Sequence, residues 1–213
     1  MSDHVTIFIV DDDSQLSESL GALVRSIGLK TRLFRSPEEF LDEYESDMRG
    51  CVVLDIRMQG MSGTKLFEVM KSRGYSIPVI FLTAYGDVPT AVQAIREGAV
   101  DFLIKPAHPS EFCAKVLQAV QLDERRRGTI EAHNAALKLL DQLSDREEEV
   151  LDLVIQGLSS KQIASRLNIA SKTVDKHRTS LMQKLGASNS ADLVRIALGV
   201  RNHGSNESQG SIE

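Results

Sequence analysis

A chain of 213 residues that is 42% hydrophobic can form one large domain or two modest ones, each with a buried core. No stretch approaches the roughly 18 consecutive apolar residues of a membrane span, and the amino terminus, MSDHVTIFIV, lacks the basic start of a signal peptide, so we expect a cytoplasmic protein that does not bind membranes. The net charge of −5 argues weakly against nucleic-acid binding, but the charge must be counted region by region before this can be judged. The two cysteines, Cys51 and Cys113, have the spacing of neither a metal site nor a redox site.

Short β-rich runs alternate with amphipathic helical patterns from the start of the chain to residue 121. The runs are VTIFIV, KTRLF, CVVLD, PVIFLT and DFLIK. Five strands in strict alternation with five helices predict an α/β domain built on a doubly wound, five-stranded parallel sheet of order 2-1-3-4-5. Ser36 before Pro37 marks a helix start, and glycines at 28, 74 and 98 mark helix ends.

Polar residues follow four of the five expected strands, namely Asp11, Asp12 and Asp13 after the first, Asp55 after the third, Thr83 after the fourth and Lys105 after the fifth. In a sheet of this kind, functional groups gather at the carboxyl ends of the strands. Neighbouring carboxylates repel one another unless a cation joins them, and Mg²⁺ prefers one or two carboxylates together with a phosphate. Asp55 would then be a nucleophile toward phosphorus, with Thr83 and Lys105 stabilising the transferred oxygens.

Four segments within the first 120 residues together resemble the receiver domain of two-component response regulators: IFIVDDDS, VVLDIRMQGMSG, VIFLTAYGD and GAVDFLIKPAHPSEF. The resemblance implies that Asp55 accepts a phosphoryl group. It also implies that Mg²⁺ or Mn²⁺ is bound by Asp11, Asp12, Asp55 and the backbone carbonyl of Arg57.

The same resemblance implies further roles at the strand ends. Thr83 matches a switch hydroxyl, Phe102 a switch aromatic and Lys105 the phosphoryl-stabilising lysine, whose bond to Pro106 is typically cis in the family. The sequence departs from the family at Gln59, where a proline is usual, and this departure bears on the rigidity of the loop.

Each of these residues also has a simpler interpretation when it is considered alone. Asp55 fits a turn, Thr83 a packed strand and Lys105 a solvated strand end, so only the ordered set supports phosphoryl chemistry. Asp13 fits a loop or helix start, and Phe102 fits the core. In a further hypothesis, the large side chains of Arg57 and Tyr85 hinder the approach of water to a phosphoryl group on Asp55.

Residues 122–142 are charged and then helical, and predict that the fifth helix extends into a helical linker. Residues 143–201 contain no strand pattern and predict an all-α domain of four short helices. Ser144 with Glu147 and Ser159 with Gln162 have capping-box spacing, and Ser171 and Asn189 are further candidate caps. The polar residues 202–213 predict a disordered tail.

The segment 160–185 predicts a helix-turn-helix with a compact positive patch. Between residues 161 and 184, Asp175 is the only acidic residue, against the basic residues Lys161, Arg166, Lys172, Lys176, Arg178 and Lys184. At helical spacing, Val174, Leu181 and Leu185 face inward, whereas the outward face carries Lys172, Thr173, Lys176, Thr179, Ser180 and Gln183. This face can reach DNA bases and phosphates. His177 and Arg178 lie at its margins, where they contact the DNA backbone or pack.

The segment LSDREEEVLDLVIQGLSSKQIASRLNIASKTVDKHRTSLMQKL resembles the LuxR-type helix-turn-helix. Together with a receiver domain, it implies the NarL/FixJ group, with similarity to regulators of aromatic-hydrocarbon catabolism. This resemblance implies a sensor histidine kinase, RNA polymerase and a double-stranded operator with two half-sites as partners, and a homodimer when phosphorylated. The last helix, SADLVRIALG, resembles the group's dimerisation helix and is expected to expose Leu193, Val194 and Ala197, although core packing explains the same residues.

We therefore expect a DNA-binding regulator that is not a dedicated enzyme. Two alternative functions were considered. A haloacid-dehalogenase-like phosphatase would use Asp11 as its nucleophile, but it needs an acidic pair after Lys105. Between residues 106 and 120 only Glu111 is acidic, and Asp55 would have no role. In the other alternative, a receiver-fold protein binds DNA without responding to phosphate.

Overall fold

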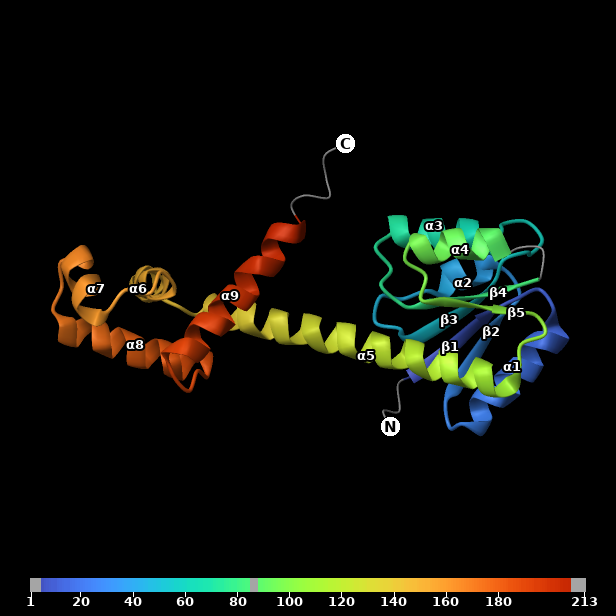
Figure 1. Ribbon diagram of the computed structural model, residues 1–213, viewed down its shortest axis with the longest axis horizontal. Coiled ribbons are helices and arrows are strands. Elements are labelled where there is room, and N and C mark those ends of the chain that lie inside the picture. Colours follow the sequence, from blue (N-terminus) through green and yellow to red (C-terminus); the bar gives the residue numbers. More distant parts are fainter. Residues whose placement is uncertain (1–4, 85–87, 208–213) are drawn as a thin grey trace. The chain divides into compact units, whose positions relative to one another are not determined.

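The computed structural model describes residues 5–84 and 88–207 (Figure 1). The chain divides into two compact units, residues 1–127 and 128–213. The division lies inside one helix, α5 (Pro109–Leu140), and within the segment that was predicted to be a linker. No helix in the described ranges is long and apolar enough to span a membrane.

The first unit is built on the predicted five-stranded sheet. The strands are β1 (Val5–Val10), β2 (Lys30–Phe34), β3 (Arg49–Asp55), β4 (Val79–Thr83) and β5 (Asp101–Ile104). All neighbouring pairs are parallel and the order is β2-β1-β3-β4-β5, so the predicted topology is confirmed. Because every strand runs in the same direction, the residues that follow β1, β3, β4 and β5 meet at one edge of the sheet.

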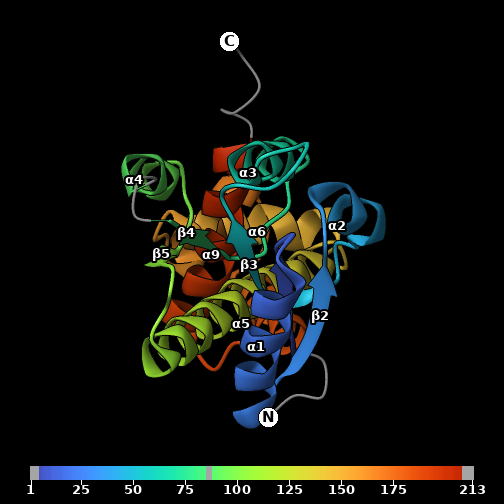
Figure 2. The same ribbon diagram turned by 90° about the vertical axis from the view of Figure 1, so that its right-hand side faces the viewer.

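Helices cover both faces of this sheet, as Figure 2 shows. The helices α2 (Pro37–Glu43), α3 (Gly63–Ser72) and α4 (Val88–Arg96) lie on one face, and α1 (Ser14–Ser26) and α5 lie on the other. Successive residues of β1 and β3 alternate between two cores: Phe8 and Val52 pack toward Phe40 of α2, whereas Ile7 and Val53 pack on the opposite side. Burial on both faces explains why the strands are almost continuously apolar.

The predicted helix boundaries in this unit agree with the structure. Ser36 caps α2 by accepting a hydrogen bond from the backbone N–H of Glu39 at 3.2 Å. Glycines with positive φ follow α1, α3 and α4 at residues 28, 74 and 98. The peptide bond between Lys105 and Pro106 is cis, as the family resemblance implied.

A buried ion pair fixes α5 to the start of β3. The Asp123 carboxylate is 3% exposed and accepts a hydrogen bond from the backbone N–H of Gly50 at 2.9 Å. Arg127 donates to the same carboxylate at 3.0 Å and to the carbonyl of Met48. Gly50 has φ +129°, and a Cβ there would lie 2.0 Å from the Thr6 carbonyl oxygen, so only glycine fits. The first unit therefore extends through Arg127.

In the described part of the second unit, which ends at residue 207, four helices follow α5, as predicted: α6 (Asp145–Ile155), α7 (Ser160–Leu167), α8 (Ser171–Leu185) and α9 (Ser190–Glu207). Their apolar faces form one core. Both predicted capping boxes are present, and Asn189 caps α9 by accepting from the backbone N–H of Asp192 at 2.9 Å.

One prediction about a helix start in this unit was wrong. Ala170 is the N-cap of α8, and Ser171 is its first helical residue, because the Ala170 carbonyl already accepts the backbone N–H groups of Thr173 and Val174. The helix α9 ends at Glu207, within the segment 202–213 for which a disordered tail was expected.

Candidate metal centre and nucleic-acid interface

Three acidic side chains meet where β1 and β3 end. Asp11 and Asp12 directly follow β1, and Asp55 is the last residue of β3. One carboxylate oxygen from each lies within 4.8 Å of the other two, so the predicted group is brought together. Asp11 and Asp55 are 1% and 5% exposed, whereas Asp12 is exposed. Three clustered carboxylates are hard oxygen donors, which suit a divalent cation of the Mg²⁺ or Mn²⁺ type.

Lys105 joins the two buried carboxylates from the end of β5. Its Nζ lies 2.7 Å from Oδ2 of Asp11 and 2.8 Å from Oδ1 of Asp55. Burial raises the pKa of the Asp55 carboxyl, and the hydrogen bond and charge of Lys105 oppose that shift. Burial alone would lower the pKa of Lys105, but its bonds to Asp11 and Asp55 outweigh this effect and raise it. The ammonium group therefore offsets part of the repulsion between the carboxylates.

Asp12 and Asp13 have different roles in the loop after β1. Asp13 caps α1, because its carboxylate accepts the backbone N–H groups of Gln15 and Leu16 at 3.0 Å, so Asp13 is the helix-start residue of the simpler interpretation. Asp12 instead accepts the backbone N–H of Gln59 at 3.1 Å. Gln59 lies in the loop after β3, so this bond connects the loops that follow two neighbouring strands.

The other predicted residues differ in burial and in their contacts. Thr83 is fully buried at the end of β4, and its hydroxyl donates to the Ala84 carbonyl at 3.0 Å. Phe102 is half-buried and packs against the core cluster under α3 and α4, as its simpler interpretation predicts. Arg57 is exposed in the loop after β3, and Tyr85 lies outside the described residues.

A glycine that the sequence reasoning did not single out brings α3 close to Asp55. A Cβ on Gly63 would lie 1.9 Å from the backbone oxygen of Asp55. The Gly63 N–H donates to the carbonyl of Ile56 at 3.0 Å, which closes the loop between β3 and α3. The sequence signal that could have predicted this contact is a glycine at the expected start of a helix, four positions after Gln59.

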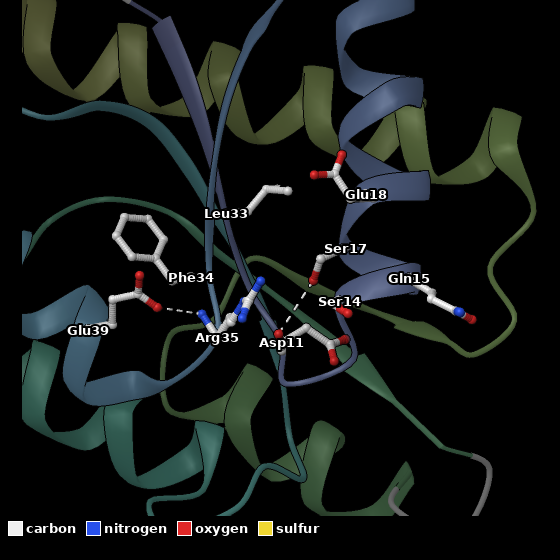
Figure 3. Close-up of a pocket in the computed structure, with 9 residues that line it drawn as sticks. All are labelled: Asp11, Ser14, Gln15, Ser17, Glu18, Leu33, Phe34, Arg35 and Glu39. Atoms are coloured by element: carbon white, nitrogen blue, oxygen red, sulfur yellow. Dashed lines mark hydrogen bonds between the residues drawn. The ribbon is translucent and has the colours of Figure 1, made fainter.

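A polar cavity of about 510 Å³ opens beside Asp11, between α1 and the loop from β2 to α2 (Figure 3). It is lined by Asp11, Ser14, Gln15, Ser17, Glu18, Leu33, Phe34, Arg35 and Glu39. The backbone N–H of Arg35 donates to Glu39 at 2.7 Å. Its lining carries three carboxylates and one guanidinium group, so the cavity is acidic on balance.

In the second unit, α8 presents the outward face that the helical spacing predicts. Val174, Leu181 and Leu185 are buried in the core, while the exposed side forms a shallow groove lined by Lys172, Asp175, Lys176, Thr179, Ser180 and Gln183. The turn between α7 and α8 begins at Asn168, whose backbone is left-handed with φ 52°. Such a helix, with amines near its amino end, suits the major groove of DNA.

Ser180 and Arg178, which were predicted to contact DNA, form hydrogen bonds with other helices of the unit. The Ser180 hydroxyl donates to Oε1 of Glu147 at 2.6 Å. Arg178 donates to the hydroxyls of Ser190 at 2.8 Å and Ser160 at 3.5 Å. His177 is half-buried at the margin of the face. These contacts connect α8 to α6, α7 and α9.

Glu147 is a buried carboxylate that joins α6 to α8. It is 5% exposed, closes the capping box with Ser144 and accepts Nζ of Lys184 at 2.7 Å. Lys184 also donates to the Gln142 carbonyl at 3.1 Å. The bond from Lys184, followed by those from Ser144 and Ser180, lowers the pKa of Glu147 well below its usual range. The spacing of Ser144 and Glu147 predicted only the capping box. The contact with Lys184 could not be predicted, because no local sequence signal connects positions 147 and 184.

Family models and known proteins match both units. The model "Response regulator receiver domain" matches residues 7–117, and "Bacterial regulatory proteins, luxR family" matches residues 141–197. The chain is 41% identical to the transcriptional regulatory protein TdiR of Thauera aromatica over 198 residues, covering 93% of this chain and 87% of that protein. The response regulator protein TodT of Pseudomonas putida is 40% identical over 197 residues, with 92% and 87% covered.

Solved structures of response regulators are similar to this chain over most of its length. The response regulator StyR superposes with a TM-score of 0.82 at 40% identity, over 91% of this chain and 98% of that one. Full-length FixJ from B. japonicum gives a TM-score of 0.58 at 33% identity, over 94% and 99%. The chain belongs to the NarL/FixJ group of two-component response regulators. The regulator thus combines a receiver domain with a LuxR-type DNA-binding domain.

Three residues on the last helix of the regulator were expected to be exposed, and for two of them the expectation was wrong. Leu193 and Ala197 are both 0% exposed, and Val194 is half-buried against the same core. The three side chains lie on the side of α9 that packs on α6 and α8, so core packing, the alternative interpretation, explains them. Sequence spacing located the apolar side of α9 but could not show that the unit itself covers it.

Proposed function

We propose that a sensor histidine kinase phosphorylates the regulator at Asp55 in the presence of Mg²⁺ or Mn²⁺. The observation that carries this proposal is the meeting of Asp11, Asp12 and Asp55 with the Lys105 ammonium at one edge of the sheet. A group with two buried carboxylates joined by a cation, and a third carboxylate that is exposed, has a nucleophile, a positive charge and metal-binding oxygens, which are the components of a phosphoryl-acceptor site. The metal would be held by Asp11, Asp12, Asp55 and the Arg57 carbonyl, and would neutralise charge on the phosphoryl oxygens.

The reaction transfers one phosphoryl group from the kinase to the regulator. An Oδ atom of Asp55 attacks phosphorus, a P–O bond forms, and the P–N bond to the kinase histidine breaks as its imidazole leaves and takes up a proton. Lys105, already 2.8 Å from Asp55, moves its ammonium group onto a phosphoryl oxygen. The Thr83 hydroxyl exchanges its bond to the Ala84 carbonyl for one to another phosphoryl oxygen. Attack of water on the phosphorus of the acyl phosphate at the same site would release inorganic phosphate and regenerate the Asp55 carboxylate.

Phosphorylation then favours a homodimer that binds two operator half-sites and acts on RNA polymerase. The DNA contacts are made by Lys172, Thr173, Lys176 and His177, which lie on or beside the exposed face of α8. Lysines neutralise phosphates and Thr173 reads base edges in the major groove. Leu193, Val194 and Ala197 are core residues, so we assign the dimer interface to none of them.

The test uses acetyl phosphate as the donor and compares three full-length proteins. The parental protein should gain one acid-labile phosphoryl group that requires Mg²⁺, and Asp55→Ala should gain none. Asp42→Ala, which removes an exposed carboxylate on α2, should behave like the parental protein. Trapping of the phosphoryl group on Asp11 would support the phosphatase alternative, and DNA affinity and mass that ignore phosphorylation would support constitutive binding.

A further inference from the structure

Asp12 differs from the other two members of the acidic group in what holds its carboxylate. Asp11 and Asp55 are buried and are both bonded to Lys105. Asp12 is exposed and accepts a hydrogen bond at Oδ2 from the backbone N–H of Gln59 at 3.1 Å. An exposed carboxylate is free to adopt several rotamers unless such a contact selects one of them.

We propose that Gln59 is a positioning residue for the metal site, acting through its backbone N–H rather than its side chain. The proposal rests on the proposed function, because it takes the acidic group to be a divalent-metal site. A carboxylate has two oxygens, so the bond to Oδ2 leaves the other oxygen available for the metal.

The loop that carries Gln59 is itself anchored close to Asp55. Gly63 N–H donates to the Ile56 carbonyl, and the Ser62 hydroxyl caps α3 by accepting the Lys65 N–H at 3.2 Å. The loop between these anchors contains Arg57 as well as Gln59. The amide of Gln59 therefore fixes Asp12 relative to the strand end that carries Asp55. Outer partners of metal ligands typically contribute about 10- to 100-fold to metal affinity.

Any residue except proline supplies this donor, and that gives a matched pair of variants. Gln59→Ala removes the side chain and keeps the N–H, whereas Gln59→Pro removes the N–H. Titration calorimetry with Mg²⁺ should give parental affinity for Gln59→Ala and about tenfold weaker binding for Gln59→Pro, at the lower end of the range for such partners. The Mg²⁺ concentration for half-maximal phosphoryl uptake should rise by the same factor in Gln59→Pro.

Proline also restrains the loop, so the two variants are repeated in an Asp12→Ala background. If the bond to Asp12 is what matters, Gln59→Pro should not weaken Mg²⁺ binding further in that background. Equal weakening in both backgrounds, or parental affinity in Gln59→Pro, would overturn the proposal. An Asp12→Ala protein that binds Mg²⁺ as tightly as the parental protein would instead refute the proposed metal site.

A second measurement does not depend on the folding of the proline variant. In the ¹⁵N NMR spectrum of the full chain without metal, the Gln59 amide proton should exchange more slowly with solvent in the parental protein than in Asp12→Ala. The Lys65 amide, which is bonded to Ser62, is the internal control and should not change. Equal exchange of the Gln59 amide in both proteins would show that the bond does not form in solution and would overturn the proposal.

Discussion

Lys105 holds two carboxylates that would otherwise repel each other, and this contact explains how the receiver tolerates buried charge before a metal is present. Asp55 nevertheless retains a raised pKa, first because it is buried and only then because of its neighbour Asp11. An ionised carboxylate with a raised pKa destabilises the fold at neutral pH, since its charged form is better solvated in the unfolded chain. Charge at the proposed phosphoryl acceptor therefore lowers the stability of the fold.

We expect Asp55→Asn to raise the melting temperature of the receiver at pH 7 by a few degrees, since about 1 kcal/mol corresponds to about 4 °C for a domain of this size. Because the folded pKa is raised, the contribution of Asp55 to stability is present at low pH and lost as the pH rises through that pKa. The gain from Asp55→Asn should therefore shrink on acidification. Calorimetry between pH 4 and 7 checks this, with Asp42→Asn as the control, and a lower melting temperature for Asp55→Asn at pH 7 would contradict it.

Arg57 is exposed two residues after Asp55, and a large side chain there is expected to hinder water that approaches the acyl phosphate. Arg57→Ala should therefore hydrolyse its phosphoryl group several-fold faster than the parental protein. The same is expected of Tyr85→Ala from the sequence, although Tyr85 lies outside the described residues. The measurement is the decay of acid-labile phosphate after the donor is removed. Parental decay rates in both variants would refute shielding.

At the scale of single elements, α8 carries two kinds of lysine, exposed and internally bonded, which the sequence alone placed in one positive patch. Lys176 lies on the exposed groove, whereas Lys184 is bonded to Glu147 and Gln142. Helical spacing identified the inward stripe of Val174 and Leu181, because apolar periodicity is a local property. It could not identify the partner of Lys184, because that contact joins residues 37 positions apart.

The two lysines should respond differently to salt. Each phosphate contact adds about 0.9 to the magnitude of the slope of log affinity against log salt concentration. Lys176→Ala should therefore flatten that slope by roughly one unit per recognition helix, or two per dimer, whereas Lys184→Ala should weaken operator binding at a parental slope. The control is Lys138→Ala on α5, which should alter neither. A flattened slope in Lys184→Ala would place that side chain on the DNA.

The Glu147 network predicts how the stability of the DNA-binding unit depends on pH. The folded pKa of Glu147 is lowered, so its contribution is fully present above the unfolded value of 4.5 and is lost as the pH falls through the folded pKa. Glu147→Gln should therefore be less stable than the parental protein at pH 7, and the difference should shrink below pH 4.5. Urea unfolding at several pH values tests this, and a constant difference would contradict it.

At the scale of the whole molecule, phosphorylation must favour one arrangement of the regulator over another in order to change DNA affinity. A tenfold gain requires about 1.4 kcal/mol of differential interaction, and two half-sites bound together add to it through effective concentration. We expect phosphorylated protein to dimerise and bind a two-site operator at least tenfold more tightly than unphosphorylated protein. Sedimentation and operator titration measure both quantities, and the gain should disappear on an operator with one half-site.

The sequence predicted local features of the whole chain well and distant contacts poorly. Five strands, the rim carboxylates and both capping boxes follow from periodicity and short spacings. The faces covered by α1 and α2 could not be predicted, because parallel strands such as β3 are apolar on both sides. The burial of Leu193 and Ala197 and the bond between Gln59 and Asp12 depend on segments that meet only after folding.

The bond from Gly50 to Asp123 has a consequence for protein engineering. A receiver fragment cut at residue 121, where the strand and helix pattern ends, would lose Asp123 and Arg127 and leave the buried Gly50 N–H without its acceptor. An unsatisfied buried donor costs about 1–3 kcal/mol, which is a large share of the stability of a small domain. Chimeric sensors that join this receiver to a foreign output domain should therefore keep every residue through Arg127, where the first compact unit ends, and begin the foreign sequence at position 128.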